Sequence, residues 1–362
     1  MRQLNPVEVV LHCGLHKTGS TYIQRNLQTN KEILLENGIL YIGPKTLRKT
    51  LPQIWRHMDK GKPIKSSGHK KRLKQQMQRF VAQLPLAESN EIHTILISSE
   101  AIFGKLRDGF KPHKSRQKNA PGIYRYTDKR STLLLSAIEN SFHAKPLKYK
   151  ILYINKNQHA FEKSCYSQLI KEGQKHVARM DFDAFRLKSD FSHANDAFLK
   201  KSLSSLQSKY ELKIISINYE TAANHNKPSE LLWHFLDKAL PNHSQKIQNQ
   251  ITSDSTNSNL DKIHNPGLNE KGLLLARLSL HIHNRHERKR FRKFLEKKFN
   301  KSHQQKHPRL FDSLRSFRFR LINGSALNER GDAIESHFRP HLNAGELLML
   351  RKFLNQHYSK TI

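Results

Sequence analysis

The sequence predicts an α/β protein in which helices flank a parallel β-sheet. Short apolar runs rich in β-branched residues recur along the chain, and stretches of helical periodicity lie between them. Strands that alternate with helices are typical of βαβ units, whose strands run parallel and whose helices cover both faces of the sheet. The predicted strands are Val7–Leu11, Thr94–Ser98, Lys148–Ile154 and Leu212–Tyr219, and Ile39–Ile42 is expected to be extended.

Helices are predicted at Thr21–Glu36, Lys70–Leu84, His159–Glu172 and Pro228–Ala239. The last of these shows the pattern clearly, because its leucine and phenylalanine side chains fall on one face. The first ends at Asn37-Gly38, where glycine readily adopts the left-handed conformation that terminates many helices. Residues 105–130 are basic and lack periodicity, and residues 241–266 are rich in Asn, Ser, Gln and Asp, so we expect a loop in each range.

We expect residues 1–245 to form the α/β core and residues 246–362 to form a basic, helical part packed on the same domain. The stretch Arg285–Lys306 is the most basic segment of that part. A nucleic-acid-binding helix is one interpretation of it. Its Phe and Leu residues recur at helical spacing, however, which favours a helix packed on the domain, and we expect no nucleic-acid partner. The histidines of this part lack an accompanying carboxylate or cysteine pattern, so no metal site is predicted at His281, His283 and His286.

The charge balance predicts anionic ligands without identifying them. The 362 residues include 64 Lys and Arg against 30 Asp and Glu, a formal net charge of +34. Such a surface attracts nucleotides, acidic glycans, nucleic acids or acidic lipids. Two cysteines cannot form a disulfide framework, and no apolar run is long enough for a signal peptide or a transmembrane segment. We therefore expect a soluble, cytoplasmic protein.

The most informative segment follows the first predicted strand and reads Cys13-Gly14-Leu15-His16-Lys17-Thr18-Gly19-Ser20-Thr21. A strand, a glycine-bounded loop and a helix in succession direct backbone N–H groups and a helix dipole at one anion. Gly14 and Gly19 have the spacing of the glycines in the P-loop pattern G-x-x-x-x-G-K-[ST]. Ser20 stands where that pattern requires lysine, and Lys17 lies inside the loop instead.

This segment resembles the 5′-phosphosulfate loop of sulfotransferases that use 3′-phosphoadenosine-5′-phosphosulfate (PAPS), whose core reads Lys-[Ser/Thr]-Gly-[Thr/Ser]-Thr. His before the lysine and Gln24 after the threonine are similar to the bacterial branch of that family. The resemblance implies a P-loop nucleotide-kinase-like fold, a PAPS co-substrate and no metal. It also implies donor contacts from the loop residues His16, Lys17, Thr18, Gly19, Ser20 and Thr21, with Lys17 stabilising the bridging oxygen. A strand–helix turn without a ligand and an unusual P-loop kinase are the alternatives.

The same family carries a second nucleotide element after a later strand, an arginine followed eight positions later by a serine that together bind the 3′-phosphate. Here Lys156 and Ser164 have that spacing after the strand that ends at Ile154. Lysine keeps the positive charge but loses the two-pronged geometry of arginine. The resemblance therefore implies a 3′-phosphate site that is weaker or shared with another cation.

Glu100 follows the strand Thr94–Ser98, and a carboxylate at that end of a parallel strand points toward the ligand crevice of an α/β sheet. Related bacterial and glycan sulfotransferases often have an acid at this point. Glu100 is our candidate general base, which removes the proton of the acceptor hydroxyl. The alternative is a helix N-terminal acid that stabilises the dipole near Ala101.

The resemblance extends from about residue 7 to residue 240, because Ile215–Glu220 and the following helix also match the family, while the C-terminal third matches only loosely. It predicts transfer of a sulfuryl group from PAPS to an acceptor hydroxyl by in-line displacement. The expected acceptor is a saccharide on an acidic or neutral glycan, with a glycolipid or small metabolite as alternatives. A P-loop kinase and a basic nucleic-acid-binding protein with a degenerate loop are the rival functions.

Overall fold

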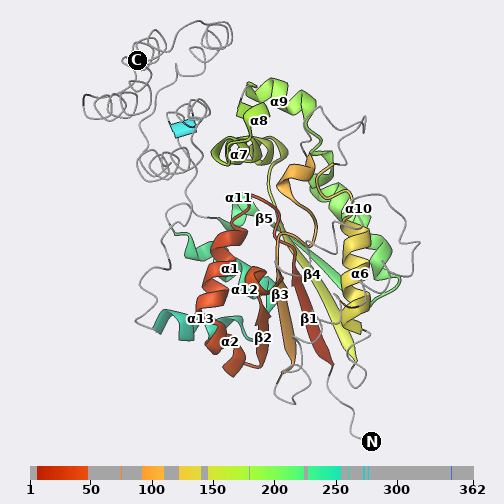
Figure 1. Ribbon diagram of the computed structural model, residues 1–362. Coiled ribbons are helices and arrows are strands. Elements are labelled where there is room, and N and C mark those ends of the chain that lie inside the picture. Colours follow the sequence, from red (N-terminus) through yellow and green to blue (C-terminus); the bar gives the residue numbers. More distant parts are fainter. Residues whose placement is uncertain are drawn as a thin grey trace, which may run out of the picture. The chain divides into compact units, whose positions relative to one another are not determined.

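A computed structural model of the 362-residue chain describes residues 6–47, 92–109, 122–139, 146–178, 180–223 and 227–253, together with positions 75, 260, 272, 273, 276 and 344 (Figure 1). The chain divides into two compact units. The first comprises Met1–Cys165 and Lys188–His264, and the second comprises Tyr166–Leu187 and Asn265–Ile362. The sheet and all the predicted site residues belong to the first unit.

Five parallel strands form the sheet, in the order β2-β3-β1-β4-β5 (Figure 1). Their bounds are β1 Val7–His12, β2 Ile39–Ile42, β3 Thr94–Ser98, β4 Leu147–Asn155 and β5 Leu212–Asn218. Helices pack against the sheet, which confirms the predicted α/β class. The order places β1 in the centre, between β3 and β4, so the loop that follows β1 begins where the strand order reverses. Ligands of open α/β sheets bind at such a point.

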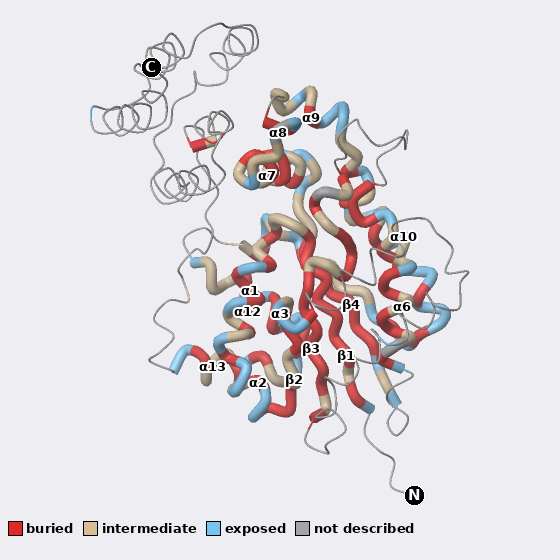
Figure 2. Tube along the Cα trace, in the orientation of Figure 1, coloured by how far each residue is buried: buried red, intermediate tan, exposed pale blue. Residues whose placement is uncertain are grey.

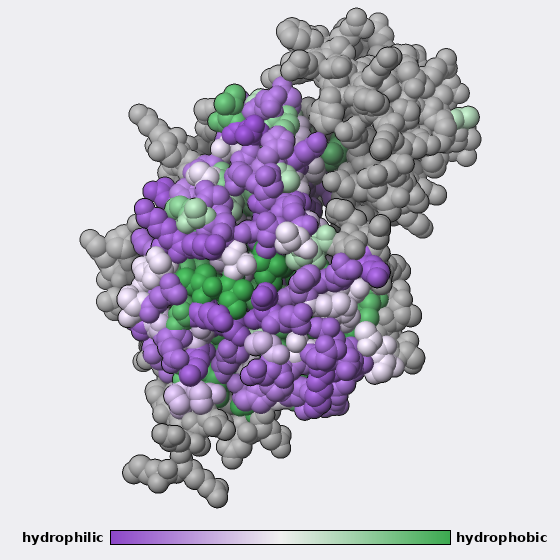
Figure 3. Space-filling view, turned by 180° about the vertical axis from the view of Figure 1, so that it is seen from behind, coloured by the Kyte–Doolittle hydropathy of each residue, from purple (hydrophilic) through white to green (hydrophobic). Residues whose placement is uncertain are grey.

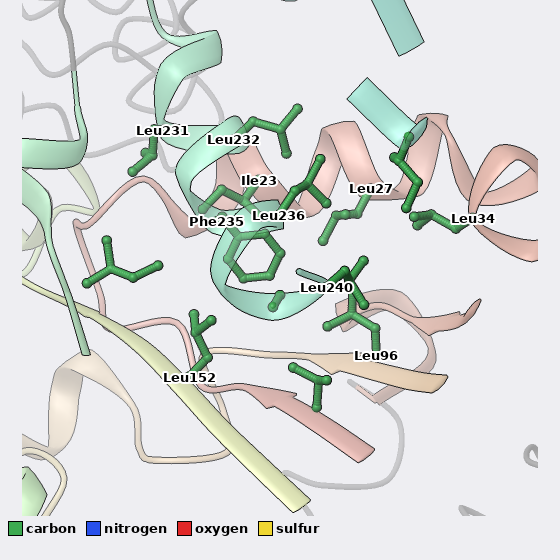
Figure 4. Close-up of a cluster of buried hydrophobic side chains, with 14 of the residues drawn as sticks. Ile23, Leu27, Leu34, Leu96, Leu152, Leu231, Leu232, Phe235, Leu236 and Leu240 are labelled. Carbon is green, nitrogen blue, oxygen red and sulfur yellow. The ribbon is translucent and has the colours of Figure 1, made fainter. Parts of the chain in front are cut away.

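One face of the sheet is covered by helices α1 Ser20–Thr29, α2 Lys31–Glu36, α12 Ser229–Ala239 and α13 Ser244–Ser253. Figure 4 shows Leu96 and Leu152 of the sheet beneath Ile23 and Leu27 of α1 and Phe235 of α12. All of these side chains are buried, and the strands form the buried centre of this unit (Figure 2). Apolar side chains at helical spacing on each helix therefore fix the helices on the sheet.

The opposite face is covered by α6 Thr127–Glu139 and α10 Asp196–Gln207, which pack on each other (Figure 1). On α10 the buried residues are Leu199, Leu203 and Leu206, and their spacing defines one apolar face. The side chain of Asn195 accepts a hydrogen bond from the N–H of Phe198 and caps this helix. The expectation that residues 105–130 form a loop is wrong where α6 begins, and at Leu106–Gly109, which form a short 3₁₀ helix (η2).

Two further helix predictions need correction. The single helix predicted over Thr21–Glu36 is divided at Asn30 into α1 and α2, because Asn30 has φ −100° and ψ 28° and leaves helical geometry. The loop predicted over residues 241–266 contains α13. Ile247 and Ile251 are buried one turn apart in that helix, so two apolar anchors offset its polar composition. The predicted end of the first helical region is confirmed, since Gly38 has φ 69°.

The helices predicted at His159–Glu172 and Pro228–Ala239 agree with the structure, whereas the helices between Lys175 and Gln207 were not predicted. Helix α7 spans Gln158–Lys171, and α12 begins at Ser229, one residue after Pro228. The remaining short helices are α3 Pro44–Leu47, α8 Lys175–Ala178, α9 Phe182–Lys188, η3 Ser192–Ala194 and α11 Tyr219–Ala222. In the second unit, the Tyr166 ring lies 5.1 Å from that of Phe185, and its hydroxyl donates to the Met180 carbonyl.

Several predictions fall outside the described residues. They are the helix Lys70–Leu84 apart from Gln75, the basic residues 110–121, and the C-terminal part beyond Ser253, including Arg285–Lys306 and the three histidines before it. Figure 3 shows one face of the molecule, which is mostly hydrophilic and has its largest hydrophobic area near the centre and smaller ones elsewhere. The mean hydropathy of the chain is −0.73. Within the described ranges, no helix has the length and apolar character that crossing a membrane requires.

Candidate functional site

The glycine-bounded loop connects the C-terminal end of β1 with α1. Its first residue is fixed to the sheet, because the Cys13 N–H donates to the Leu152 carbonyl of β4. On the other side of β1, the Ser99 N–H donates to the His12 carbonyl. Glu100 follows β3 and Lys156 follows β4, so parallel pairing brings the three predicted segments to one edge of the sheet. This edge is the candidate site.

Hydroxyl groups hold the loop in shape from within. The Thr18 hydroxyl donates to the Leu15 carbonyl at 2.8 Å, and the Ser20 hydroxyl donates to the same oxygen at 3.1 Å. Thr18 and Ser20 are buried, whereas Thr21 is exposed. The side chains of Thr18 and Ser20 therefore stabilise the turn, and any contact they make with an anion comes mainly from their backbone N–H groups.

Both glycines of the loop are required by its geometry. A Cβ atom at Gly14 would lie 2.3 Å from the Ser20 Oγ atom, and one at Gly19 would lie 2.4 Å from Cδ2 of Leu231. Gly19 also has φ 81°, in the left-handed region that glycine adopts without strain. Lys17 adopts that region as well, with φ 66°. A non-glycine residue there stores roughly 1 kcal/mol of strain, which is common at functional loops.

Helix α1 presents an uncapped N-terminus at the end of this loop. Gly19 occupies the N-cap position, and no side chain caps the helix. The Tyr22 N–H donates to the Gly19 carbonyl, so the N–H groups that precede Tyr22 are the ones for which the helix itself supplies no acceptor. The helix dipole places partial positive charge on them. Together with Lys17 in the preceding turn, this arrangement suits a phosphate or sulfate group.

Glu100 forms an ion pair with His16 of the loop. The Nδ1 atom of His16 lies 3.0 Å from Oε2 of Glu100, and its Nε2 atom lies 3.3 Å from the Gly104 carbonyl oxygen. Tyr124 holds His16 from a third side: its hydroxyl accepts the His16 backbone N–H at 2.8 Å, and the two rings stack with centroids 6.1 Å apart. The family resemblance implied that His16 binds PAPS, and Glu100 was expected to face the acceptor hydroxyl. In the structure the two side chains are in contact.

The surroundings of Glu100 favour its ionised form. Burial acts to raise the pKa of this carboxyl, but the hydrogen bond from His16 and the charges of His16, Lys17 and His12 outweigh it, so the pKa is lowered. His12 is itself fully buried, and burial lowers its pKa to about 4 although the Glu100 charge opposes this. Near neutral pH, His12 is therefore neutral, and its Nδ1 atom lies 2.8 Å from the Ser98 hydroxyl.

The alternative role for Glu100, a helix N-terminal acid, finds no helix to stabilise. Residues 100–103 form turns, and the next helical residues are Leu106–Gly109. The side chain that caps the turn is Ser99, whose hydroxyl accepts the Ala101 N–H at 3.2 Å. Glu100 is thus left to pair with His16.

Lys156 and Ser164, the two residues that the family resemblance singled out after β4, are in contact. The Lys156 Nζ atom donates to the Ser164 hydroxyl at 3.4 Å, and Ser164 donates to the Ala160 carbonyl one turn earlier in α7. The ammonium group also lies 4.7 Å from the centre of the Tyr219 ring, a cation–π distance. Tyr219 in turn borders the phosphate loop, since its Cε2 atom is 3.6 Å from where a Gly19 Cβ would lie.

The two lysines of the site act on the same buried group. Burial raises the pKa of the Cys165 thiol, while the charges of Lys17 and Lys156 oppose that rise. The charge of Glu100 also reaches this thiol. The charged groups of Lys17, Glu100 and Lys156 therefore lie near one another, although they come from the loop after β1, the end of β3 and the end of β4. Among the described residues, no group of three or more His, Cys, Asp or Glu side chains is arranged to hold a metal ion.

Sequence reasoning missed Tyr124 and Tyr219 as parts of this site. Tyr124 has φ 62° and is buried, and its pKa is raised, chiefly by burial, so it remains a neutral phenol. An isolated tyrosine in a basic segment gives no signal of this role. Tyr219 was recognised only as part of the scaffold, because its contact with Lys156 depends on the pairing of β4 with β5.

Comparisons with known proteins add little to this description. A scan against models of protein families and a search of curated proteins both find no match. One solved structure, from a study of the PezAT chromosomal toxin–antitoxin system of Streptococcus pneumoniae, is similar over 68% of this chain and 88% of that chain. Its sequence identity is 14% and its TM-score is 0.25, values too low to support a conclusion about this protein.

Proposed function

We propose that this protein is a sulfotransferase that moves a sulfuryl group from PAPS to an acceptor hydroxyl. The observation that carries the proposal is the placement of two cationic sites at one sheet edge. Lys17 lies in the loop between the two glycines, and Lys156 pairs with Ser164 at the end of β4. One cation suits the 5′-phosphosulfate of the donor, and the other suits its 3′-phosphate.

The loop supplies the 5′ site. The N–H groups of Gly19, Ser20 and Thr21 open α1 and provide donors for phosphate oxygens, and Lys17 provides charge beside the bridging oxygen. Ser20 occupies the position of the lysine in nucleoside-triphosphate P-loops, and its buried hydroxyl donates to Leu15 instead. A short donor with one phosphate and one sulfate fits this loop better than a nucleoside triphosphate does.

The proposed reaction is an in-line displacement. The carboxylate of Glu100 takes the proton of the acceptor hydroxyl while that oxygen forms a bond to sulfur. The bond between sulfur and the bridging oxygen breaks, and its electron pair remains on the departing adenosine-3′,5′-bisphosphate. Lys17 stabilises the negative charge that develops on the bridging oxygen.

The proposed acceptor is a hydroxyl of a saccharide on a glycan. A carboxylate base suits an alcohol nucleophile, and a chain with net charge +34 attracts acidic glycans in particular.

Thermal unfolding with two nucleotides tests the proposed donor. Adenosine-3′,5′-bisphosphate should raise the melting temperature well above the shift caused by the same concentration of ADP, because only the first occupies both cationic sites. Lys156→Ala should remove most of that difference and leave the small ADP effect unchanged. Lys201→Ala, an exposed lysine on α10, is the control and should bind both nucleotides as the wild type does.

Equal shifts from the two nucleotides in the wild type would contradict a 3′-phosphate site and favour a kinase-like protein. A protein that responds to neither nucleotide but binds random DNA with a steep salt dependence would favour the nucleic-acid-binding alternative.

A further inference from the structure

We propose that His16 is a positioning residue for Glu100: it holds the Oε2 atom of the carboxylate and thereby leaves Oε1 to receive the proton of the acceptor. The catalytic meaning of this inference rests on the proposed function. The contact that carries it is the 3.0 Å distance between Nδ1 of His16 and Oε2 of Glu100.

The hydrogen-bond partners of His16 define where its protons lie. We assign a proton to Nε2, because the Gly104 carbonyl oxygen, 3.3 Å away, only accepts. A bare ring nitrogen and a carboxylate oxygen are both acceptors, so the contact between Nδ1 and Oε2 must contain a second proton. His16 and Glu100 therefore share one proton, and they exchange it as a coupled pair.

We infer that the proton shared by His16 and Glu100 resides on the His16 ring when Glu100 acts as the base. The hydrogen bond from His16 and the nearby charges lower the pKa of Glu100 despite its burial. An imidazolium ring facing a carboxylate results, and the carboxylate keeps the ability to accept a proton on its other oxygen. If the proton moved to Oε2, Glu100 would become a carboxylic acid and a poor base.

The structure holds this pair from several sides. The Gly104 N–H donates to the Glu100 carbonyl at 3.5 Å, so Gly104 contacts the backbone of one partner and the ring of the other. Tyr124 holds the backbone and the ring face of His16. The ionisable groups that lower the pKa of Glu100 are the His16 ring, Lys17 of the same loop and His12 at the end of β1. His12 contributes only in acid, because its own ring is neutral near neutral pH.

As a consequence, Glu100, the proposed base, is linked to the loop that is proposed to bind PAPS. His16 directly precedes Lys17, the proposed donor cation, and its ring holds the base through a hydrogen bond. A displaced carboxylate costs up to about 100-fold in rate when the reacting atoms move by about 1 Å. The position of the loop therefore affects how well Glu100 is aligned.

Nitrogen-15 NMR of the histidine rings tests the pairing without any assay of activity. In the wild type, the His16 ring should keep protons on both nitrogens at pH values where the ring in Glu100→Gln has lost one. The exposed ring of His234 on α12 is the internal control and should give the same spectra in both proteins. An unchanged His16 titration in Glu100→Gln would overturn the inference. The reciprocal measurement, the carboxyl carbon-13 shift of Glu100 in His16→Asn, serves if Glu100→Gln does not fold.

Turnover as a function of pH tests the positioning role. His16→Ala should lower the maximum rate by about 10- to 100-fold. His16→Asn should recover part of that loss, because the amide still donates to Oε2. It should also move the acidic limb of the profile to higher pH, because burial of Glu100 is no longer opposed by the ring charge. Equal losses in both variants with no shift of the limb would show a purely structural role.

The two tests separate the inference from the proposed function. A His16 ring that responds to Glu100→Gln in a protein that does not bind adenosine-3′,5′-bisphosphate would contradict the donor and preserve the pair. Selective binding of adenosine-3′,5′-bisphosphate together with a His16 ring that is unchanged in Glu100→Gln would support the donor and contradict the pair.

Discussion

The two ends of the parallel sheet both contain charged side chains, and they hold them in different ways. At the N-terminal end, the buried Lys150 Nζ atom donates to Glu8 at 3.0 Å and to the Ala239 carbonyl at 2.9 Å. At the C-terminal end, Lys17 sits in a left-handed turn and α1 begins without a cap. The first arrangement joins β1, β4 and α12. The second arrangement places the N–H groups of the α1 N-terminus and the strained Lys17 backbone at the point where the strand order reverses.

Ionised groups occur in both the scaffold and the candidate site, and the two ends of the sheet show how to tell them apart. A buried cation with an acceptor on each side is satisfied by the protein itself and has little left for a ligand. A strained loop with a helix N-terminus and two lysines is stabilised when an anion arrives. Substitutions at the two ends should therefore produce different phenotypes.

The largest expected contrast is between two glutamates. Glu100→Gln should reduce turnover by ~10²–10⁴-fold while donor affinity stays nearly unchanged, because the amide cannot accept the proton. Glu8→Gln, at the other end of the sheet, should leave turnover intact and lower stability slightly. Steady-state rates and melting temperatures of both variants make the comparison, and a fully active Glu100→Gln would remove the proposed base.

Lysines of one strand give the next contrast, in stability. Lys150→Met leaves the Ala239 carbonyl without its buried donor and should lower the free energy of unfolding by about 2 kcal/mol, because Glu8 is partly exposed and water can replace its partner. Lys148→Met is the matched control on β4. Its ion pair with Glu211 is exposed, so its loss should cost at most about 0.5 kcal/mol. Urea unfolding measures both, and similar losses would mean that burial does not distinguish the two pairs.

Acid should weaken the C-terminal end through His12. Folding lowers the pKa of this buried ring from 6.5 to about 4, so the unfolded chain binds more protons than the folded chain between those values. Its stabilising contribution is complete above pH 6.5 and is lost as the pH falls toward 4, by about 2 kcal/mol between pH 6.5 and pH 5.

Between pH 6.5 and pH 4, the free energy of unfolding should depend less steeply on pH in His12→Asn than in the wild type. This slope can be compared even if the variant is less stable at every pH. His243, at the N-terminal end, also has a lowered pKa, chiefly from partial burial and then from His93 and Lys246. His243 is more exposed than His12, so its substitution should change the slope less. A steeper change from His243→Asn would reverse the comparison.

The sequence predicted the elements whose signals are local. The strands, the glycine-bounded loop and α12 each have apolar or glycine spacing that can be recognised within a few residues. Helix α13 was missed because its two buried isoleucines lie among polar residues. The division at Asn30 was missed because asparagine is tolerated in helices and breaks them only in some contexts.

The contacts of the candidate site were harder to predict, because they depend on strand order. His16 and Glu100 are 84 positions apart and meet only because β3 lies beside β1. Tyr124 contacts His16 across 108 positions. A single sequence contains no signal for such pairs. Lys156 and Ser164 were singled out through the family resemblance, because a lysine and a serine eight positions apart carry no signal of their own. Their contact is local, since Lys156 lies just before α7 and Ser164 lies within it.

The smallest expected effect tests how well the lysine at the end of β4 replaces an arginine. Lys156→Arg adds a planar group that can bind a phosphate with two parallel hydrogen bonds, and Tyr219 offers a ring on which that group can stack. The affinity for adenosine-3′,5′-bisphosphate should rise about 3- to 10-fold, by titration calorimetry, while that for ADP stays the same. Weaker bisphosphate binding would mean that the compact ammonium group, held by the Ser164 hydroxyl at 3.4 Å, is fitted to this site. An equal gain for ADP would mean that residue 156 contacts the 5′ side of the nucleotide, and the assignment of the two cations would have to be exchanged.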